Sequence, residues 1–160
     1  MNGNPAGTPF WPSDNPAVIA NINLLQGIIT RLANNSASSK TWCLTLTGAL
    51  VSLTGATHVP GIITFALVPI VIFGFIDTMY LSQEKAYRDL YNQLVGKIRD
   101  GSYSLSNVFE AKAPLKFGHV IKSLISWSIF PVYGGLIVMY FIACNAGWLE
   151  VLASVPAKGK

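Results

Sequence analysis

Hydrophobic and polar positions alternate along this chain with the period of an α-helix, first in an amphipathic segment and then in longer apolar runs. Between 16 and 34, apolar residues recur every three or four positions, which predicts an amphipathic helix with one apolar face. Asn15 and Pro16 form a typical helix start, because the asparagine side chain caps free N–H groups and the proline loses no hydrogen bond there. The apolar face consists of Val18, Ile22, Leu25, Ile29 and Leu32.

The charge of this amphipathic helix indicates what it packs against. Helices that bind a membrane surface are usually rich in Lys and Arg, whereas this one carries Arg31 alone. We therefore expect it to pack on the protein's own cytosolic part, with the membrane surface as the alternative. The next residues, 35–40, have no strong periodicity and are expected to close the helix.

Three apolar runs follow, over 41–57, 61–82 and 120–144. A helix needs about 20 apolar residues to cross a bilayer. The first two runs are joined by a short turn and predict a transmembrane hairpin, in which the short first crossing extends through its polar ends or thins the bilayer. The third run predicts a third crossing. The alternative is a bend near Pro131 that turns this segment back to its starting side.

The second apolar run continues into charged sequence without a helix-breaking residue. Asp77 ends the apolar stretch, and neither Gly nor Pro occurs between it and Val95. The sequence therefore predicts one helix over 61–99, whose first part crosses the membrane and whose second part extends into the cytosol. A loop over 100–119 connects it to the third crossing.

These elements predict an all-α fold, an integral membrane helical bundle with three transmembrane helices, an N-terminal amphipathic helix and a long second helix that extends into the cytosol. A single domain is expected over 16–155, between a flexible tail over 1–15 and a C-terminal tail over 156–160. The first residues lack the basic and apolar regions of a signal peptide, so we expect the crossings themselves to direct insertion.

Basic residues set the orientation expected for these crossings. All Lys and Arg residues except Lys158 and Lys160 precede the first crossing, lie between the second and third, or stand at the start of the third. Cytoplasmic loops carry such an excess of positive charge. We therefore place the N-terminus and the 83–119 segment in the cytoplasm, and the 58–60 turn and the C-terminal tail outside.

Composition supports a membrane protein. Of the 160 residues, 51% are hydrophobic and 11% charged, whereas soluble domains average about 25% charged residues. The net charge is +4. The basic residues lie between apolar segments and form no stripe that would follow a phosphate backbone, so no nucleic-acid partner is predicted.

Residues with catalytic or metal-binding chemistry form no recognisable group. Cys43 and Cys144 lie far apart in apolar runs, without metal-binding spacing. His58 and His119 are expected on opposite sides of the membrane, so neither a metal nor another cofactor is predicted. The sequence shows no nucleophile with an adjacent base and no carboxylate pair in a cleft, which argues against an enzyme.

One face of the long second helix carries charged and aromatic residues at intervals of three and four. They are Asp77, Tyr80, Glu84, Arg88 and Tyr91. We interpret this coupling stripe as the part that links cytosolic events to the membrane through one rigid helix, with an ion pair between Glu84 and Arg88. The alternative is structural: Asp77 lies at the headgroup boundary and pairs with a neighbouring helix. Its predicted partners are His119, Lys122 and Lys40, among which the sequence does not choose.

The first crossing carries a seam of small and hydroxylated residues at intervals of four and three. They are Thr41, Thr45, Gly48, Ser52 and Gly55. Helices in lipid associate through such seams, because small side chains allow close approach and hydroxyls bond across the interface. The seam can pack within one chain or, in an oligomer, face a symmetry axis and line a narrow pore.

Two prolines interrupt the backbone hydrogen bonds of the later crossings. Pro69 lies in the second crossing and Pro131 in the third. A proline in a transmembrane helix removes one hydrogen bond and kinks the helix. Both are therefore candidate hinges, although most such kinks are static.

Two stretches, LLQGIITRLANNSASSKTW and VPIVIFGFIDTMYLSQEKAYRDLY, resemble a group of small, poorly characterised bacterial inner-membrane proteins. The shared pattern is an Arg-containing amphipathic helix, Asn-Ser and Lys-x-Trp before a short crossing, a Pro-containing second crossing, and then Asp, Tyr-Leu, Glu, aromatic-Arg and Leu-Tyr. The matching residues are Arg31, Asn35, Ser36, Lys40, Trp42, Pro69, Asp77, Tyr80, Leu81, Glu84, Tyr87, Arg88, Leu90 and Tyr91. The chain departs from the pattern at Gly74 and Phe75, where related sequences carry a large aromatic residue before the acidic one.

The layout is also similar to the two-helix membrane effectors of bacterial antiphage systems, such as the SLATT type, in which a cytosolic signal is proposed to trigger membrane disruption. This resemblance implies a homo-oligomeric, multi-pass protein of the bacterial inner membrane, with the lipid bilayer and a cytosolic protein as partners. It would act as a membrane-disrupting effector or membrane subunit of an antiphage defence system. The chain has no recognisable nucleotide sensor, so a separate protein would supply the sensing.

Two other functions compete with the effector. The first is a non-permeabilising anchor or adaptor that docks a cytosolic protein through Glu84, Arg88 and the segment 103–117. The second is a small transporter, which would carry inverted repeats and ionisable residues at mid-bilayer. The sequence shows neither feature, so the anchor is the main alternative.

Overall fold

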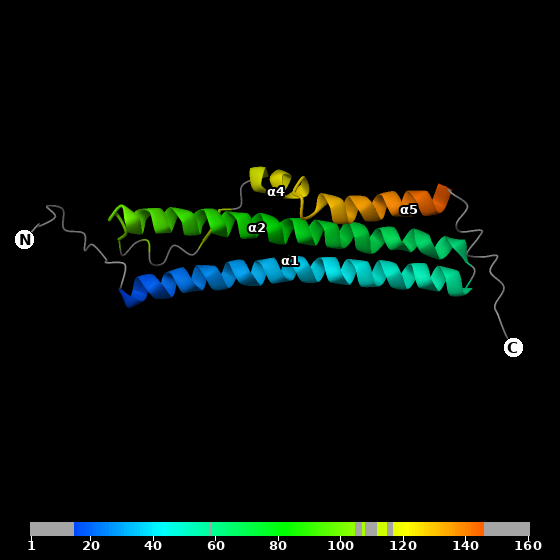
Figure 1. Cartoon of the computed structure of the whole chain (residues 1–160), viewed down its shortest axis with the longest axis horizontal. Helices are drawn as coiled ribbons and strands as arrows, with labels where there is room; N and C mark the ends of the chain where they lie inside the picture. The colour runs from blue at the N-terminus through cyan, green and yellow to red at the C-terminus, as the bar shows by residue number, and fades with distance from the viewer. Residues whose placement is uncertain (1–14, 58, 105–106, 108–111, 115–116, 146–160) are drawn as a thin grey trace, which may run out of the picture.

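The computed structural model describes residues 15–57, 59–104, 107, 112–114 and 117–145, and in this part of the chain every regular element is helical. Two long helices lie side by side along the whole molecule, and shorter helices cover one side of the pair (Figure 1). The predicted all-α class is therefore confirmed for the described part. The two predicted tails, apart from Asn15, lie outside the described residues.

Helix α1, Pro16–Thr57, is one continuous helix of 42 residues, about 63 Å long. It begins as predicted, because the Asn15 side chain accepts a hydrogen bond from the Ala17 N–H at 2.9 Å. Its first half carries the predicted apolar face, and Val18 and Leu25 of that face are fully buried.

The junction at 35–40 does not close the first helix, in contrast to the prediction, and it joins the amphipathic segment directly to the first apolar run. Its serines are bonded in ways that a helix permits. Ser39 donates to the Asn35 carbonyl at 2.9 Å, and Ser36 bonds a side chain of the second long helix. Ser36 therefore faces the second long helix, Ser39 bonds within its own helix, and the helical backbone is not interrupted.

The second long helix returns antiparallel to α1 after a short turn. The 3-10 helix η1, Pro60–Ala66, leads into α2, Leu67–Arg99, so helical structure is continuous over the predicted range 61–99. Pro69 lies in the first turn of α2, where the N–H groups have no partner within an α-helix. It therefore stands at the junction between the two helix types.

Helix α2 ends in a glycine turn. Gly101 has a φ of 71°, a left-handed conformation that glycine adopts without steric cost. The Ser102 N–H bonds the Lys97 carbonyl at 2.9 Å, and the Gly101 N–H bonds the Ile98 carbonyl at 3.3 Å. The chain then folds back, and the Tyr103 ring becomes buried against both long helices.

The amphipathic half of α1 packs on the protein itself, as predicted. Its apolar face meets the last turns of α2 and the aromatic ring that follows them. The buried residues of this cluster are Val18, Leu25, Leu90, Leu94 and Tyr103.

The third apolar run was predicted to be one helix over 120–144, but the structure divides it. It consists of α4, Phe117–Leu124, a turn over 125–129, the π-helix η2, Phe130–Gly134, and α5, Gly135–Asn145. Pro131 explains the break, because it has no N–H for the carbonyl four residues earlier and it restricts the residue before it. Up to residue 145 the chain does not double back, since α4 and α5 advance towards the same end of the bundle (Figure 1).

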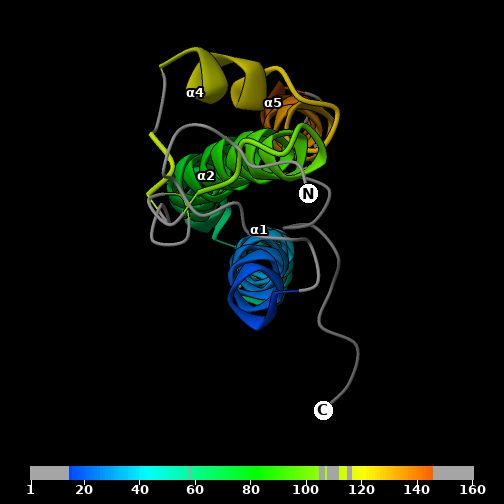
Figure 2. The same ribbon diagram turned by 90° about the vertical axis from the view of Figure 1, so that its left-hand side faces the viewer.

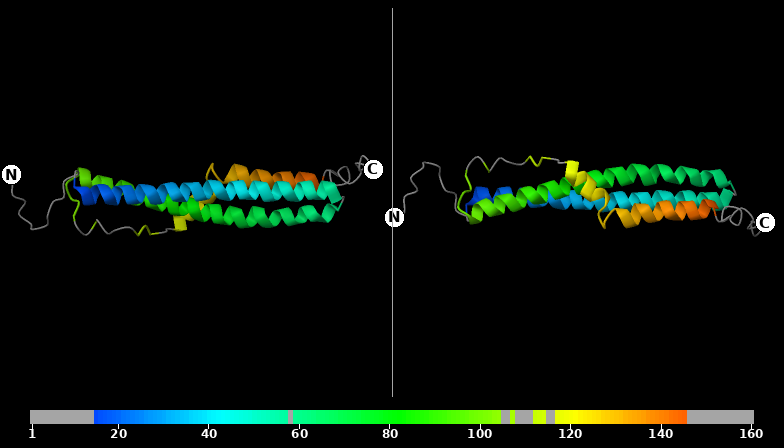
Figure 3. Two further views of the ribbon diagram at one scale, coloured as in Figure 1. Left: turned by 90° about the horizontal axis from the view of Figure 1, so that it is seen from below. Right: turned by 90° about the horizontal axis from the view of Figure 1, so that it is seen from above.

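The two parts of this run lie differently on α2. Helix α5 follows the bundle axis, as α1 and α2 do, and the end-on view looks down the axes of all three (Figure 2). Helix α4 is seen from the side in that view and crosses obliquely over α2 when the bundle is viewed from above (Figure 3). The turn over 125–129 makes this change of direction.

The two ends of the bundle expose different side chains. The apolar end, where α1 and α2 are joined, comprises 41–82 and 130–145, and the polar end comprises 15–40 and 83–104. Large exposed apolar residues gather at the apolar end, whereas in the described polar end only Ile19 and Leu24 are of this kind. Those at the apolar end include Trp42, Leu44, Val51, Phe65, Val71 and Met139. An exposed apolar surface of this extent is typical of contact with lipid or with another protein.

By length and composition, one helical stretch of the described chain, Gly61–Arg99, is able to cross a membrane. Phe130–Ile142 is also apolar but shorter. The structure therefore supports a helical protein with one candidate membrane-spanning helix, and the three-crossing bundle stays a prediction.

Candidate functional site

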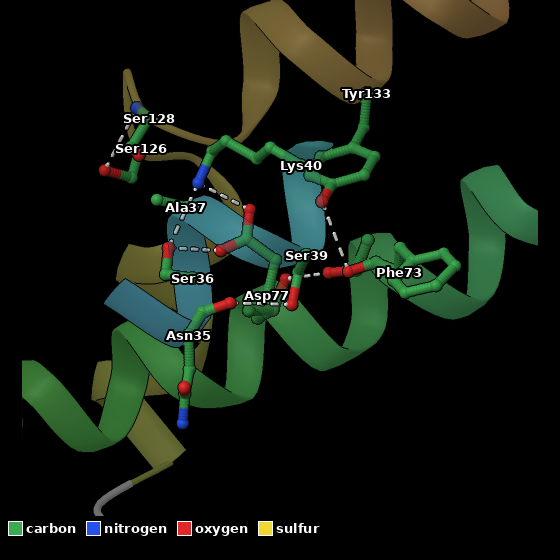
Figure 4. Close-up of polar contacts among 12 residues, drawn as sticks. Asn35, Ser36, Ala37, Ser39, Lys40, Phe73, Asp77, Ser126, Ser128 and Tyr133 are labelled. Atoms are coloured by element: carbon green, nitrogen blue, oxygen red, sulfur yellow. Dashed lines mark hydrogen bonds and ion pairs between the residues drawn. The ribbon is translucent and has the colours of Figure 1, made fainter. Parts of the chain in front are cut away.

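Asp77 is fully buried near the middle of the bundle, where α2 meets α1 and the beginning of η2 (Figure 4). Lys40 Nζ lies 2.7 Å from Asp77 Oδ2, and Ser36 donates its hydroxyl hydrogen to Oδ1. Lys40 also donates to the Ser36 hydroxyl oxygen at 3.0 Å. The ammonium is close enough for an ion pair but is not aligned for a hydrogen bond to Oδ2. We call these three residues the ion-pair cluster.

The cluster forms because its two α1 members share one face of that helix. Ser36 and Lys40 are four residues apart, so both reach the same carboxylate on α2. Of the three predicted partners of Asp77, the structure selects Lys40. His119 lies instead 3.3 Å from Asp89. Lys122 contributes its backbone carbonyl, which accepts a hydrogen bond from Lys85 at 3.1 Å.

Tyr133 of η2 covers the cluster, and its ring has room there because the facing residue of α2 is a glycine. Its ring packs on Gly74, where a Cβ atom would stand 3.3 Å from the ring Cδ1 atom. Its hydroxyl donates to the Phe73 carbonyl at 3.3 Å. The space beside Gly74 is filled by this aromatic ring from another element.

Burial of this ion pair costs desolvation free energy, but it also makes the loss of either partner destabilising. Removing two charges from water is expensive, so a buried pair adds little net stability compared with apolar residues of the same shape. Removing one partner leaves an uncompensated charge, which costs about 3–5 kcal/mol. The cluster therefore holds α1 and α2 in one register, because any sliding of the helices separates the charges.

The coupling stripe divides into a buried and an open part. Asp77 and Glu84 are buried, whereas Arg88 is exposed and pairs with Glu84 at 2.6 Å. The Tyr91 hydroxyl accepts a hydrogen bond from Gln26 of α1 at 3.2 Å. Tyr80 is half-buried. The predicted Glu84–Arg88 pair is confirmed, and the stripe as a whole follows the contact between the two long helices.

The open part of the stripe borders a groove at the polar end. This groove has a volume of about 450 Å³ and lies between α1 and α2. Its lining consists of Gln26, Ile29, Thr30, Arg88, Tyr91 and Asn92. The groove offers one guanidinium and several amide and hydroxyl groups to a ligand or a peptide.

The small-residue seam faces away from the rest of the described chain. Thr41, Thr45, Gly48 and Ser52 are exposed, Gly55 is half-buried, and a Cβ atom on Gly48 would meet nothing within 4 Å. The hydroxyls bond carbonyls of their own helix, as Thr45 does to Thr41 at 2.9 Å and Ser52 to Gly48 at 2.9 Å. Packing of the seam within one chain, one of the two predicted readings, is therefore not observed among the described residues.

The predicted docking segment 103–117 is partly used inside the protein. Asn21 of α1 donates to the Tyr103 hydroxyl at 2.9 Å and to the Asn107 carbonyl at 3.3 Å. Lys97 donates to the Asn107 side chain at 2.7 Å. Its described core residues are thus closed to a partner, while 105–106, 108–111 and 115–116 lie outside the described part.

Residues with metal-binding or redox chemistry are dispersed. In the part of the chain that the structure describes, no three His, Cys, Asp or Glu side chains come together as metal ligands. Cys43 is buried, Cys144 is exposed, and both are free thiols. His58 lies outside the described residues.

Comparisons with protein-family models, with curated proteins and with solved structures found no match to this chain. The functional argument therefore depends on the arrangement itself. Sequence reasoning found Asp77 and included Lys40 among its partners, but it missed the part played by Ser36 and Tyr133. The four-residue spacing of Ser36 and Lys40 was the available signal for the first, whereas nothing local pointed to the second.

Proposed function

We propose that the chain is an oligomeric membrane effector, or the membrane subunit, of a bacterial antiphage defence system. Its apolar end would lie in the inner membrane, in three crossings, and its polar end in the cytosol. A cytosolic partner would act on the polar end, and the assembled apolar ends would then permeabilise the membrane.

The observation that supports this proposal best is the unpartnered seam on α1. A stripe of small and hydroxylated residues on a lipid-facing helix brings two backbones close together. Since the described chain places nothing against Gly48, this surface is free for a second copy. Several copies meeting through Thr41, Thr45 and Ser52 would surround an axis with hydroxyl groups.

The coupling part of the proposal rests on the continuity of the two long helices. α1 and α2 each extend from the apolar end to the polar end without a break. The ion-pair cluster fixes their register near the middle. A partner that moves α2 at Arg88 would therefore move the apolar end as well, because the buried pair opposes sliding between the helices.

The first experiment compares oligomer formation and membrane damage in seam variants. We expect Gly48→Leu with Ser52→Leu to abolish chemical cross-linking between copies in lipid nanodiscs. Leucine is a better helix former than glycine, so the loss would not come from unfolding of α1. Induced expression in bacteria, followed by inner-membrane potential and dye entry, tests whether damage is lost together with assembly.

Gly61→Leu is the matched control. Gly61 is exposed at the apolar end, and a Cβ atom there also meets nothing within 4 Å, but it lies off the seam in η1. This variant should assemble like the native chain. Assembly that persists in the Gly48/Ser52 variant, at equal membrane levels, would contradict the proposal.

The groove at the polar end favours a second candidate function, a non-permeabilising anchor for a cytosolic protein. Arg88 lines this groove with its side chain exposed. On this hypothesis Arg88→Glu would abolish partner capture, whereas Arg99→Glu, which changes an exposed arginine outside the groove lining, would not. Capture with an unchanged membrane potential, whatever the state of the seam, would favour the anchor over the effector.

A further inference from the structure

Helix α4 has its polar side turned inwards and its apolar side turned outwards. His119 faces α2, where it lies 3.3 Å from Asp89, and Ser123 is completely buried. On the outer side Phe117 is 78% exposed, and Ile121 and Leu124 are exposed as well. These three residues are four and three positions apart and therefore share one face. A helix on a water-soluble protein shows the opposite arrangement.

The turn that follows α4 extends the same apolar surface. Ile125 is 76% exposed and Trp127 is 90% exposed. Phe130, at the start of η2, is also exposed and connects this surface to the apolar end. Nothing in the described chain covers these side chains. Since this patch is continuous with the apolar end, for which we propose contact with lipid, lipid is also the expected contact of the patch.

The position and direction of α4 fit the boundary of a membrane. It contacts α2 at Asp89 and Lys85, just beyond the fully buried Asp77, so it lies between the two ends of the bundle. It also crosses over α2, whereas α1 and α5 follow the bundle axis (Figures 2 and 3). If α2 crosses a bilayer along its length, α4 is inclined to the bilayer normal and lies at the level where the apolar end meets the polar end (Figure 3).

We propose that α4 and the turn over 125–129 form an interfacial anchor, which inserts Phe117, Ile121, Ile125 and Trp127 into the headgroup boundary of a phospholipid leaflet that contains anionic lipids. Tryptophan favours this depth because its ring is apolar and its N–H is polar. Lys122 of α4 is exposed, as is Lys112, which lines one pocket together with His119 of α4, and both supply positive charge for lipid phosphates. This inference rests on the membrane placement in the proposed function, but not on oligomers or permeabilisation.

The consequence for the topology is that α4 does not belong to a third crossing. Only the helical stretch Phe130–Ile142, with the last residues of α5, would enter the apolar core of the bilayer beside α2. Such a segment is shorter than the about 20 residues of a full crossing. The interfacial anchor then fixes the depth at which this short segment begins.

The test measures the depth of Trp127 in vesicles with the full-length chain. The other tryptophans, Trp11, Trp42 and Trp148, are changed to Phe, and the protein is reconstituted into phosphatidylcholine vesicles with or without phosphatidylglycerol. Quencher groups are attached to the lipids either near the glycerol backbone or near the methyl end of the acyl chain. We expect quenching of Trp127 by the shallow group to exceed that by the deep group about twofold, as for a ring at the interface.

A second single-tryptophan chain that retains only Trp42 separates this inference from the membrane placement itself. Trp42 is exposed on α1 at the apolar end. Quenching of neither ring by any lipid would contradict the membrane placement. Quenching of Trp42 alone would contradict only the anchor and would mean that α4 stays outside the bilayer. Stronger quenching of Trp127 by the deep group would place it inside a crossing and would also contradict the anchor.

Charge and burial can be changed separately on this anchor. Ile125→Glu should move the emission of Trp127 to longer wavelength and reduce shallow quenching about twofold, because a carboxylate opposes insertion at the interface. Lys122→Glu should do so only in vesicles with phosphatidylglycerol. An equal effect of Lys122→Glu in both kinds of vesicle would contradict the preference for anionic lipids. Helix content by circular dichroism checks that each variant is folded.

Discussion

Both ends of the bundle bury apolar and polar side chains, but the surfaces of the two ends differ. Leu25 and Leu94 are fully buried at the polar end, whose surface carries charges such as Arg88 and Asp89. At the apolar end Asp77 and Ser82 are fully buried, beside a smaller apolar cluster, and the surface is apolar. The same two helices therefore change the character of their surface along their length, while both ends keep an interior of apolar and polar side chains.

This difference between the two surfaces follows from the two surroundings that we propose for the ends. In water, burial of apolar surface drives helices together, at about 25 cal/mol per Å². In lipid that force is absent between helices, and close packing and polar contacts hold them instead. The ion-pair cluster lies at the change from one regime to the other, where Lys40 and Ser36 reach Asp77 from the last polar turns before the first apolar run.

The largest effect is expected when the ion-pair cluster loses one charge. Lys40→Ala should lower the free energy of unfolding by about 3–5 kcal/mol, because Asp77 is left buried without a cation. Unfolding in mixed detergent micelles, followed by circular dichroism, measures this loss. Arg88→Ala removes the exposed partner of Glu84 and should cost at most about 1 kcal/mol.

A double variant distinguishes charge from packing in that result. Lys40→Met with Asp77→Leu replaces both charges by apolar side chains, so most of the lost stability should return. A double variant as unstable as Lys40→Ala would mean that the two side chains act through their shape. The stability of the contact between α1 and α2 at this point would then not depend on a buried charge.

The next effect compares one leucine from each end. Leu94→Ala should cost about 2–5 kcal/mol, because the residue is fully buried in the polar-end cluster. Leu44→Ala, on the exposed surface of the apolar end, should change stability by about 0.5 kcal/mol or less. Both helices keep their propensity, since leucine and alanine are both strong helix formers. Similar losses for both variants in micelles would contradict the idea that the apolar end faces lipid.

A smaller effect is expected at the close contact of α2 with η2. Gly74→Ala places a Cβ atom 3.3 Å from the Tyr133 ring, and such overpacking costs about 1–3 kcal/mol. The better helix propensity of alanine returns about 0.5–1 kcal/mol of this. In a Tyr133→Ala background the same change should therefore become neutral or stabilising. A double-mutant cycle measures the difference, and an unchanged cost in that background would place the strain elsewhere.

The sequence predicted the periodic parts of this fold well. The Asn15 cap, the amphipathic face beginning at Val18 and the uninterrupted helix through Asp77 to residue 99 all depend on local patterns, and all are confirmed. The break expected at 35–40 was not found, because Ser36 bonds Asp77 of α2 and Ser39 bonds the Asn35 carbonyl of its own helix. Local polarity indicated a loop, but tertiary partners determined a helix.

The third run shows the opposite failure. Its hydrophobicity predicted one helix over 120–144, and Pro131 was recognised only as a place for a bend. The structure turns the residues before it across α2, so that Ser123 is buried and Trp127 is exposed. Hydropathy alone does not report the direction of a helix, and it gave no reason for the Tyr133 ring to pack on Gly74. The charged residues of the candidate site, Asp77 and Lys40, could therefore be predicted from the sequence, whereas the Tyr133 ring that covers them could not.

The smallest effect is a dependence of stability on pH at Lys85, where α4 covers α2. Burial lowers the pKa of Lys85, Glu84 acts in the opposite direction, and Lys122 lowers the pKa further. A lysine with a lowered pKa binds fewer protons in the folded state, so its charge opposes folding below that pKa. Stability is regained as the pH rises through the window between the lowered value and the ordinary value of 10.5.

The measurement is the free energy of unfolding of the native chain relative to Lys85→Gln, from about pH 8 to about pH 11. Glutamine retains a donor for the Lys122 carbonyl, so the difference isolates the charge. We expect the free energy of unfolding of the native chain to increase relative to that of the variant as the pH rises. Lys122→Gln removes one cause of the shift and should reduce this gain, because the remaining cause is the burial of Lys85. A stability difference that does not change with pH would mean that α4 does not shield Lys85 from water. The contact of α4 with α2 would then not bury this charge.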